Sequence, residues 1–118
     1  MPMRTALAVA LLVFIAGVAP VAAHHGWSSY DSTKELTLTG TIKESGYEHP
    51  HGHVRLEVPG KTWLVVLAPP TRMESRGLSA AKLRVGNKAT VVGYPSRSNE
   101  EEMRAERITI DGATVELR

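Results

Sequence analysis

Five histidines are the residues of this sequence best suited to chemistry, and they fall into two groups. The first is the pair His24 and His25, and the second is the alternating stretch His49-Pro50-His51-Gly52-His53. Neutral imidazole is a good ligand for copper, zinc and nickel. Residues two apart point the same way in extended backbone, so the second group can share one face. The pattern predicts a transition-metal site with His24, His25, His49, His51 and His53 as candidate ligands.

The chemistry of the first group depends on how the chain is processed, because residues 1–23 have the parts of a secretory signal peptide. A start containing Arg4 precedes an apolar run at 6–19. That run is too short to span a membrane, which takes about 20 apolar residues. We therefore predict export, most simply to a bacterial periplasm, with residues 24–118 as one mature domain that has no membrane span. An uncleaved amino-terminal anchor is the alternative.

Two cleavage positions lead to the same metals. Cleavage after Ala23 makes His24 the first residue, so that its α-amino group and its ring can bind one ion. Cleavage after Ala22 places His25 third, so that the amine, the backbone amides and the ring can bind Cu(II) or Ni(II) in a plane. Both predict a site that exists only in the processed protein, with copper first and zinc or nickel as alternatives.

Composition and motifs exclude several function classes. The absence of cysteine excludes a disulfide scaffold, a Cys-type zinc site and a thiol nucleophile. A formal net charge of +2 is too small for a nucleic-acid partner. Ser28 and Ser29 follow the first histidine pair, but the sequence has no Gly-x-Ser-x-Gly elbow, so a hydrolase is not predicted. The triplet at 100–102 is glutamate throughout and predicts a solvated loop rather than a cation site.

The elements that must position the histidines are mostly strands. Apolar and polar residues alternate in the first two stretches, as in half-buried strands. The third, Thr62 to Leu67, is nearly all apolar and predicts a central strand with both faces covered. A helical stretch begins at Pro69-Pro70 and ends near Gly77. Strands are predicted at residues 36–42, 54–58, 62–67, 89–94, 103–110 and 114–117.

This order of elements is that of an OB-type barrel. We predict an all-β fold with small α content, a five- to six-stranded OB-like barrel with one short helical connection after the third strand. A sandwich or another small barrel would share the pattern. Trp27 and Tyr30 are predicted to form an apolar strap that packs the amino-terminal segment onto the barrel. His53 and Arg55 lie opposite Val54, so their face is expected to be solvated or covered by that segment.

A series of different short motifs, in a fixed order, spans the whole mature chain. They are residues 23–27 with Tyr30-Asp31, residues 38–42, Pro50-His51, Trp63, Gly77-Leu78, Leu83 with Gly86, residues 91–95, and Asp111-Gly112. The ordered set resembles a family of short exported bacterial proteins of unknown function. Mature members begin with a His-His pair and carry an Asn-Pro-His element after the first strand.

The resemblance implies a small OB-like β-barrel, export, and a shared role for His24, His25 and His51. It implies no reaction. His49 stands here in place of the asparagine, and His53 lies outside the family pattern. These two departures leave it open whether His49 and His53 are ligands or residues of a turn.

Three hypotheses follow. In the first, His24 and His51 form a metal site that His25 or His49 assists, and the protein carries, buffers or delivers the metal ion. In the second, the histidines are structural and the barrel is a periplasmic interaction module that docks an envelope protein. The third is an oxidative copper enzyme, which would need an open coordination position and a substrate surface. The sequence indicates neither of these, so no catalytic residue is predicted.

Overall fold

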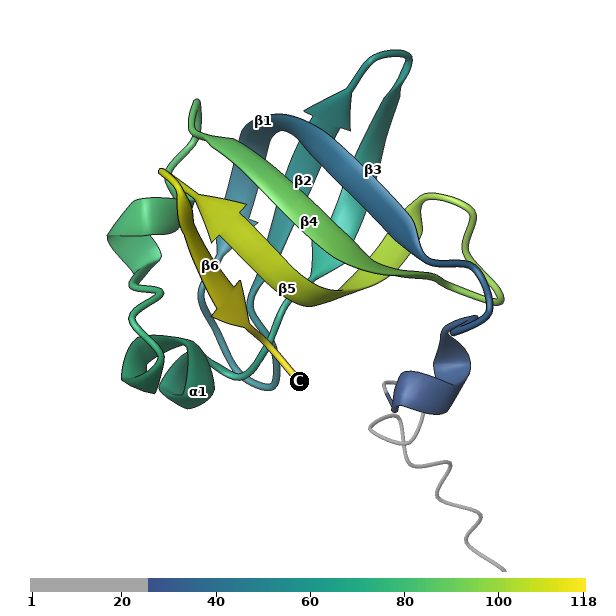
Figure 1. Ribbon diagram of the computed structural model, residues 1–118, viewed down its shortest axis with the longest axis horizontal. Coiled ribbons are helices and arrows are strands. Elements are labelled where there is room, and N and C mark those ends of the chain that lie inside the picture. The colour runs from purple at the N-terminus through teal and green to yellow at the C-terminus, as the bar shows by residue number, and fades with distance from the viewer. Residues whose placement is uncertain (1–25) are drawn as a thin grey trace, which may run out of the picture.

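The computed structural model describes residues 26–118. The predicted signal peptide and the pair His24 and His25 lie outside the described residues. Figure 1 shows a small barrel of strands with short helices packed beside it. The elements are η2 (Trp27–Ser29), β1 (Leu36–Gly46), β2 (His53–Val58), β3 (Lys61–Val66), α1 (Pro70–Ser75), η3 (Ala80–Leu83), β4 (Lys88–Pro95), β5 (Glu102–Ile110) and β6 (Ala113–Glu116).

Five strands close into a barrel. The sheet runs in the order β3-β2-β1-β4-β5-β6, and β3 also pairs with β5. This last pairing is parallel and short, joining Leu64–Val66 to Glu102–Arg104. It brings the two ends of the sheet together, while β6 adds an extra strand on β5. The predicted all-β, OB-like barrel with a helical connection after the third strand is confirmed.

Alternation along each strand builds the core. Val54 and Leu56 of β2 are fully buried, whereas Arg55 between them is exposed. The short helix α1 closes one end of the barrel with the buried side chain of Met73. Burying one such side chain contributes about 1.5–3 kcal/mol. The main contributors are Ile42, Val54, Leu56, Val65, Met73, Leu83, Val91, Met103 and Ile108.

The prediction that both faces of the third strand are covered is wrong. β3 contains one fully buried residue, Val65, while Leu64 and Val66 on its other face are only half-buried. The reason is architectural, because this face lies outside the barrel. Apolar side chains there line an open groove instead of a second core.

The amino-terminal strap, residues 26–31, is tied to the end of β4 and to the loop that follows. The backbone NH of Asp31 donates to Pro95 O at 2.9 Å, and Tyr30 forms a β-bridge with Ser96. Tyr30 is only 2% exposed. Trp27 packs edge-on against Tyr94, with ring centroids 6.2 Å apart. The predicted role of Trp27 and Tyr30 as a strap is confirmed.

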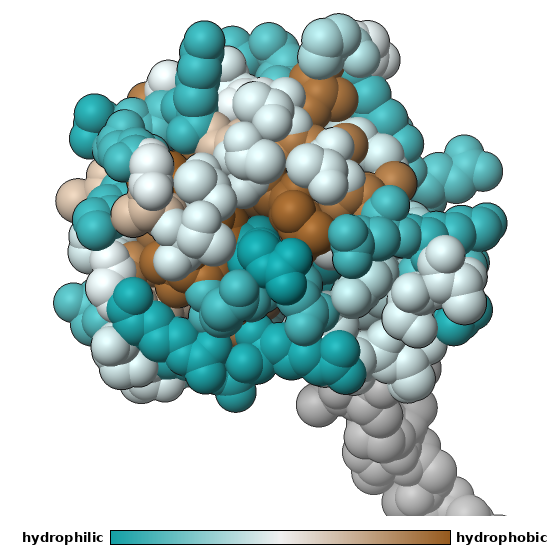
Figure 2. Space-filling model, viewed as in Figure 1, coloured by the Kyte–Doolittle hydropathy of each residue, from teal (hydrophilic) through white to brown (hydrophobic). Residues whose placement is uncertain are grey.

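The surface is a mixture of polar and apolar groups. On the face drawn in Figure 2, hydrophobic side chains emerge in patches between hydrophilic ones. A band of strongly hydrophilic side chains runs along the lower edge of this face (Figure 2). Among residues 26–118, no helix is long and apolar enough to cross a membrane.

Candidate functional site

The strand register brings three distant residues into one row outside the barrel. His53 pairs with Val66 across β2 and β3, and Val66 pairs with Arg104 across β3 and β5. Met103 points into the core, so the alternation along β5 directs Arg104 outward. A second row runs beside the first, from Arg55 through Leu64 to Glu102.

Arg104 is the centre of the candidate site. Its side chain lies outside the barrel, yet the residue is only 5% exposed, because the strap and a loop cover it. Its Nη2 donates a hydrogen bond to Nε2 of His51 at 3.3 Å. Its guanidinium carbon lies 4.3 Å from the ring centre of Trp27 and 6.0 Å from that of Tyr30. Such contacts between a cation and aromatic faces are stabilising, more so when water is excluded.

Glu102 joins the strap to the same site. The hydroxyl of Tyr30 donates to Oε2 of Glu102 at 2.8 Å, across 72 positions of sequence. Burial and this bond to a carboxylate both raise the pKa of Tyr30, so its hydroxyl remains protonated and a donor. We refer to His51, Arg104, Trp27, Tyr30 and Glu102 as the Arg104 cluster.

The loop that carries His51 is held rigidly by its neighbour. Gly52 donates its backbone NH to Ala68 O at 2.9 Å and accepts from the NH of Leu67 at 2.9 Å. It is buried, and a Cβ there would press on the terminal methyl of Met73 at 2.5 Å. A side chain at position 52 would have to shift the end of Met73, so glycine suits this position, and its two backbone hydrogen bonds fix the residue that follows His51.

An open cavity of about 380 Å³ lies beside this loop. Its floor is the outer face of β2 and β3, and Glu102 of β5 stands at its side. His51 and His53 both line it, together with Pro50, Gly52, Arg55, Leu64, Val66 and Glu102. The face of His53 and Arg55 was expected to be solvated or covered by the amino-terminal segment, and here it lines an open cavity.

The three loop histidines do not converge. His51 and His53 share the cavity wall, but His49 is exposed and precedes a cis peptide bond to Pro50. Nδ1 of His53 lies 3.9 Å from the carboxylate of Glu48. Within residues 26–118, no group of three or more histidine or acidic side chains is placed to hold a metal ion. His24 and His25 lie outside the described residues, so a site that includes them stays a prediction.

Two residues of the Arg104 cluster were not singled out from the sequence. Glu102 was predicted to lie in a solvated loop, which is wrong for this residue, because it begins β5 and accepts the hydroxyl of Tyr30. Glu100 and Glu101 are exposed, as expected. For Arg104 the local sequence offered little signal, because charged residues (Glu102, Glu106 and Arg107) also stand on either side of Met103-Arg104-Ala105.

The cation of the cluster, Arg104, is almost completely buried. Burial lowers the pKa of Arg104, and the nearby guanidiniums of Arg72 and Arg118 lower it further. Arginine nevertheless stays charged at any physiological pH, so the cation is retained and must be solvated by its neighbours. Trp27, Tyr30 and His51 perform that role. Arg104 can only donate, so the lone pair of Nε2 in His51 faces it.

Comparison with known proteins identifies a family and no function. No curated protein matches the chain. A family model described as a family of unknown function (DUF6152) matches residues 11–104, a stretch that contains the whole Arg104 cluster. The match also covers most of the chain, and it agrees with the small barrel found here. The chain therefore belongs to this family of unknown function, DUF6152.

Proposed function

We propose that the protein is an exported β-barrel that binds a divalent transition metal, copper first, through His24, His25 and His51. Zinc and nickel are the alternative metals. The proposed role is carriage, buffering or delivery of the ion. Export is proposed from residues 1–23, whose short apolar run follows a positively charged start.

One contact carries the proposal. Arg104 touches His51 through a hydrogen bond and Trp27 through its ring. His25 is two residues before Trp27, and two residues span at most about 7 Å. Chain connectivity alone therefore limits the distance from Trp27 to roughly 7 Å for the backbone of His25 and roughly 11 Å for that of His24. This supports a site in which both groups of histidines contribute ligands.

The available nitrogen atoms suit Cu(II). If processing leaves His24 first, its amine and ring form a chelate, and one further imidazole from His51 completes a nitrogen-rich set. If Ala23 is first, the ring of His25 at the third position and the backbone amides bind Cu(II) in a planar, nitrogen-rich arrangement. Glu102 places a negative charge beside the site and offsets part of the charge of Arg104.

Metal loading would change the state of His51. An arginine can only donate, so Nε2 of His51 accepts and Nδ1 carries the proton of the neutral ring. A metal that takes Nε2 must replace Arg104 there, and one that takes Nδ1 must displace its proton. Binding is therefore expected to disturb the Arg104–Trp27 contact, which makes the fluorescence of Trp27 a second readout.

The test uses protein prepared by export, so that its terminus is authentic. Cu(II) is titrated at micromolar concentration while the electron paramagnetic resonance spectrum and tryptophan fluorescence are recorded. We expect a stoichiometric, nitrogen-rich signal. His51→Gln should weaken binding at least tenfold. One extra residue before the mature terminus should abolish the signal.

His49→Gln and His53→Gln are the matched controls, because both residues come from the same loop or its edge, and His49 is exposed while His53 lies near Glu48. Each should weaken binding less than His51→Gln does. Full binding in a protein lacking both His24 and His25 would overturn the proposal and move the site to the loop. Absence of binding at micromolar copper, zinc and nickel would also overturn it and favour an interaction module for an envelope protein.

A further inference from the structure

A second pocket is lined by the strap and by none of the loop histidines. We propose that it binds a small oxyanion, either inorganic phosphate or a small carboxylate. The pocket has a volume of about 240 Å³ and is assembled from the strap, the end of β4, the β4–β5 loop and the end of the chain. We call it the arginine pocket. Its lining residues are Trp27, Ser28, Tyr30, Ser32, Tyr94, Arg97 and Arg118.

Arg97 supplies the first cation. Its Nε donates to Ser28 O at 3.1 Å, and its backbone NH donates to Ser29 O at 3.0 Å. These two bonds fix the arginine against the strap. Within residues 26–118 they leave both terminal guanidinium nitrogens for another acceptor. Paired guanidinium N–H groups match the geometry of carboxylate and phosphate oxygens.

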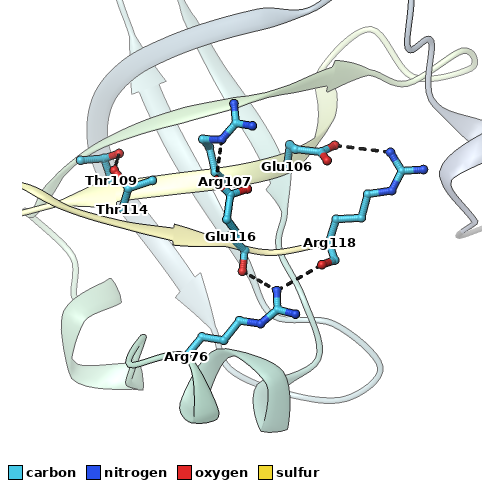
Figure 3. A network of polar contacts seen from close by, with 7 residues as sticks. All are labelled: Arg76, Glu106, Arg107, Thr109, Thr114, Glu116 and Arg118. Atoms are coloured by element: carbon cyan, nitrogen blue, oxygen red, sulfur yellow. Dashed lines mark hydrogen bonds and ion pairs between the residues drawn. The ribbon is translucent and has the colours of Figure 1, made fainter.

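Arg118 supplies the second cation. Its guanidinium carbon lies 4.6 Å from the ring centre of Trp27, so the aromatic face orients the group. Figure 3 shows the side chain of Arg118 pointing toward Glu106 of β5. The closest atoms of this ion pair, Nη1 and Oε2, are 3.6 Å apart, which is longer than a hydrogen bond. The pair therefore leaves donor capacity on Arg118.

The charge around the pocket favours an anion. None of its described lining residues is acidic. The acids closest to these cations already have partners, because Glu106 faces Arg118 and Asp31 accepts from Thr33 and lies near Lys34 as well as Arg97. The charge of Arg104 lies behind Trp27 and adds to the positive potential. The backbone oxygen of Arg118 accepts from Arg76 Nη1 at 3.1 Å. An incoming oxyanion would thus meet two arginine side chains and no acidic side chain among the described lining residues.

Size and polarity limit the ligand. Sites for drug-sized molecules measure roughly 300–1,000 Å³, so a pocket of about 240 Å³ suits a smaller molecule. The hydroxyls of Ser28, Ser32 and Tyr94 add donors around the two arginines. Hydroxyls can donate as well as accept, so together with the arginines they supply the donors that an oxyanion needs.

The experiment uses the exported, processed chain without added metal. The chain has two tryptophans, so a Trp63→Phe background leaves Trp27 as the only reporter. Inorganic phosphate and acetate are titrated separately at constant ionic strength set with chloride. We expect a saturable change in Trp27 emission with at least one of them. The tighter of the two identifies the ligand class.

Variants connect the response to the pocket. Arg97→Gln and Arg118→Gln should each weaken binding about tenfold, the usual effect of losing one charge-assisted contact. Arg84→Gln, at an exposed arginine outside the pocket, should leave it unchanged. Arg97→Gln could also loosen the strap, which a lower melting temperature would show. In that case the anion affinity of Arg118→Gln alone tests the proposal. No saturable response, or equal weakening in Arg84→Gln, overturns the proposal without bearing on the metal site.

Discussion

Arg104 of β5 and His51 of the β1–β2 loop are joined by a hydrogen bond of 3.3 Å, and the same guanidinium lies on the face of Trp27. A single buried cation therefore connects the barrel wall, the histidine loop and the amino-terminal strap. Any ligand that competes for His51 must act through this contact. The order of the strap and the state of the loop histidine are consequently coupled.

The first prediction tests how much of the stability that Arg104 provides comes from the planar shape of its guanidinium rather than from its charge. Arg104→Lys keeps a cation but loses the planar group that lies on Trp27 and reaches His51. We expect the free energy of unfolding to fall by about 1–3 kcal/mol, as for a lost buried charged hydrogen bond. Urea denaturation followed by circular dichroism measures this.

Arg107→Lys is the control on the same strand. Arg107 makes an exposed ion pair with Glu116 at 3.0 Å, a contact worth about 0–1 kcal/mol. Its replacement should change stability little. If Arg107→Lys lowered the free energy of unfolding as much as Arg104→Lys, the loss would come from placing lysine in this strand and not from the buried contacts of Arg104.

The second prediction concerns the bond between Tyr30 and Glu102. Tyr30→Phe removes the hydroxyl that donates to the carboxylate and leaves the ring in place. We expect unfolding to become easier by about 1–2 kcal/mol, because a part-buried acceptor loses its donor. Tyr94→Phe is the matched control, since its ring packs on Trp27 but its hydroxyl makes no hydrogen bond within residues 26–118. Equal effects of the two variants would argue against the bond.

Much of the fold could be predicted because local patterns specify it. Val54 and Leu56 alternate with polar residues, and this placed β2 in the sheet with the correct face inward. The turn at Asp111-Gly112 was predicted from its residue types, and both residues adopt the left-handed conformation that such turns require. Each of these inferences depends on neighbours within a few positions.

The site depended on pairings that no local pattern encodes. His51 and Arg104 are 53 positions apart, and they meet because β3 and β5 pair in parallel over three residues. Because Glu102 pairs with Leu64 in the same short parallel ladder, it is the first residue of β5 and not the loop residue that its sequence predicts. The histidine loop was recognised as chemically interesting, but its nearest charged partner could not be foreseen from spacing.

The third prediction is a pH effect at Asp31 in the strap. Hydrogen bonds from the side chain and backbone of Thr33 to this carboxylate hold its pKa below the usual value near 3.9. A lowered pKa in the folded state stabilises the protein above the unfolded pKa. That contribution is lost as the pH falls through the folded pKa, so the effect appears only below about pH 4.

Thr33→Val tests this by deleting the hydroxyl while the backbone NH remains. The pKa of Asp31, measured by carbon NMR of its carboxyl group, should rise toward its ordinary value. Thr37→Val is the control, since Thr37 is an exposed residue of β1 distant in sequence from the Asp31–Thr33 turn. An unchanged pKa in Thr33→Val would assign the shift to the backbone and nearby charges alone.

The last prediction links the backbone of β4 to the Arg104 cluster. Gly93 lies at a register irregularity opposite β5, and a Cβ there would overlap the carbonyl oxygen of Arg104. Gly93→Ala must therefore push the two strands apart, at a cost of about 1–3 kcal/mol. Because the displaced residue is Arg104 itself, the emission of Trp27 should shift as well. Chemical denaturation and fluorescence in the Trp63→Phe background measure both effects.

Gly112→Ala provides a control with a similar loss of stability but a different cause. Its φ of +78° penalises any Cβ, yet nothing lies within 4 Å of the added atom. Its destabilisation should leave Trp27 emission unchanged, because the turn between β5 and β6 does not touch the strap. If both variants shift the emission equally, the strap responds to global stability. If only Gly93→Ala does, the close approach of β4 to β5 sets the position of Arg104 and, through it, of His51.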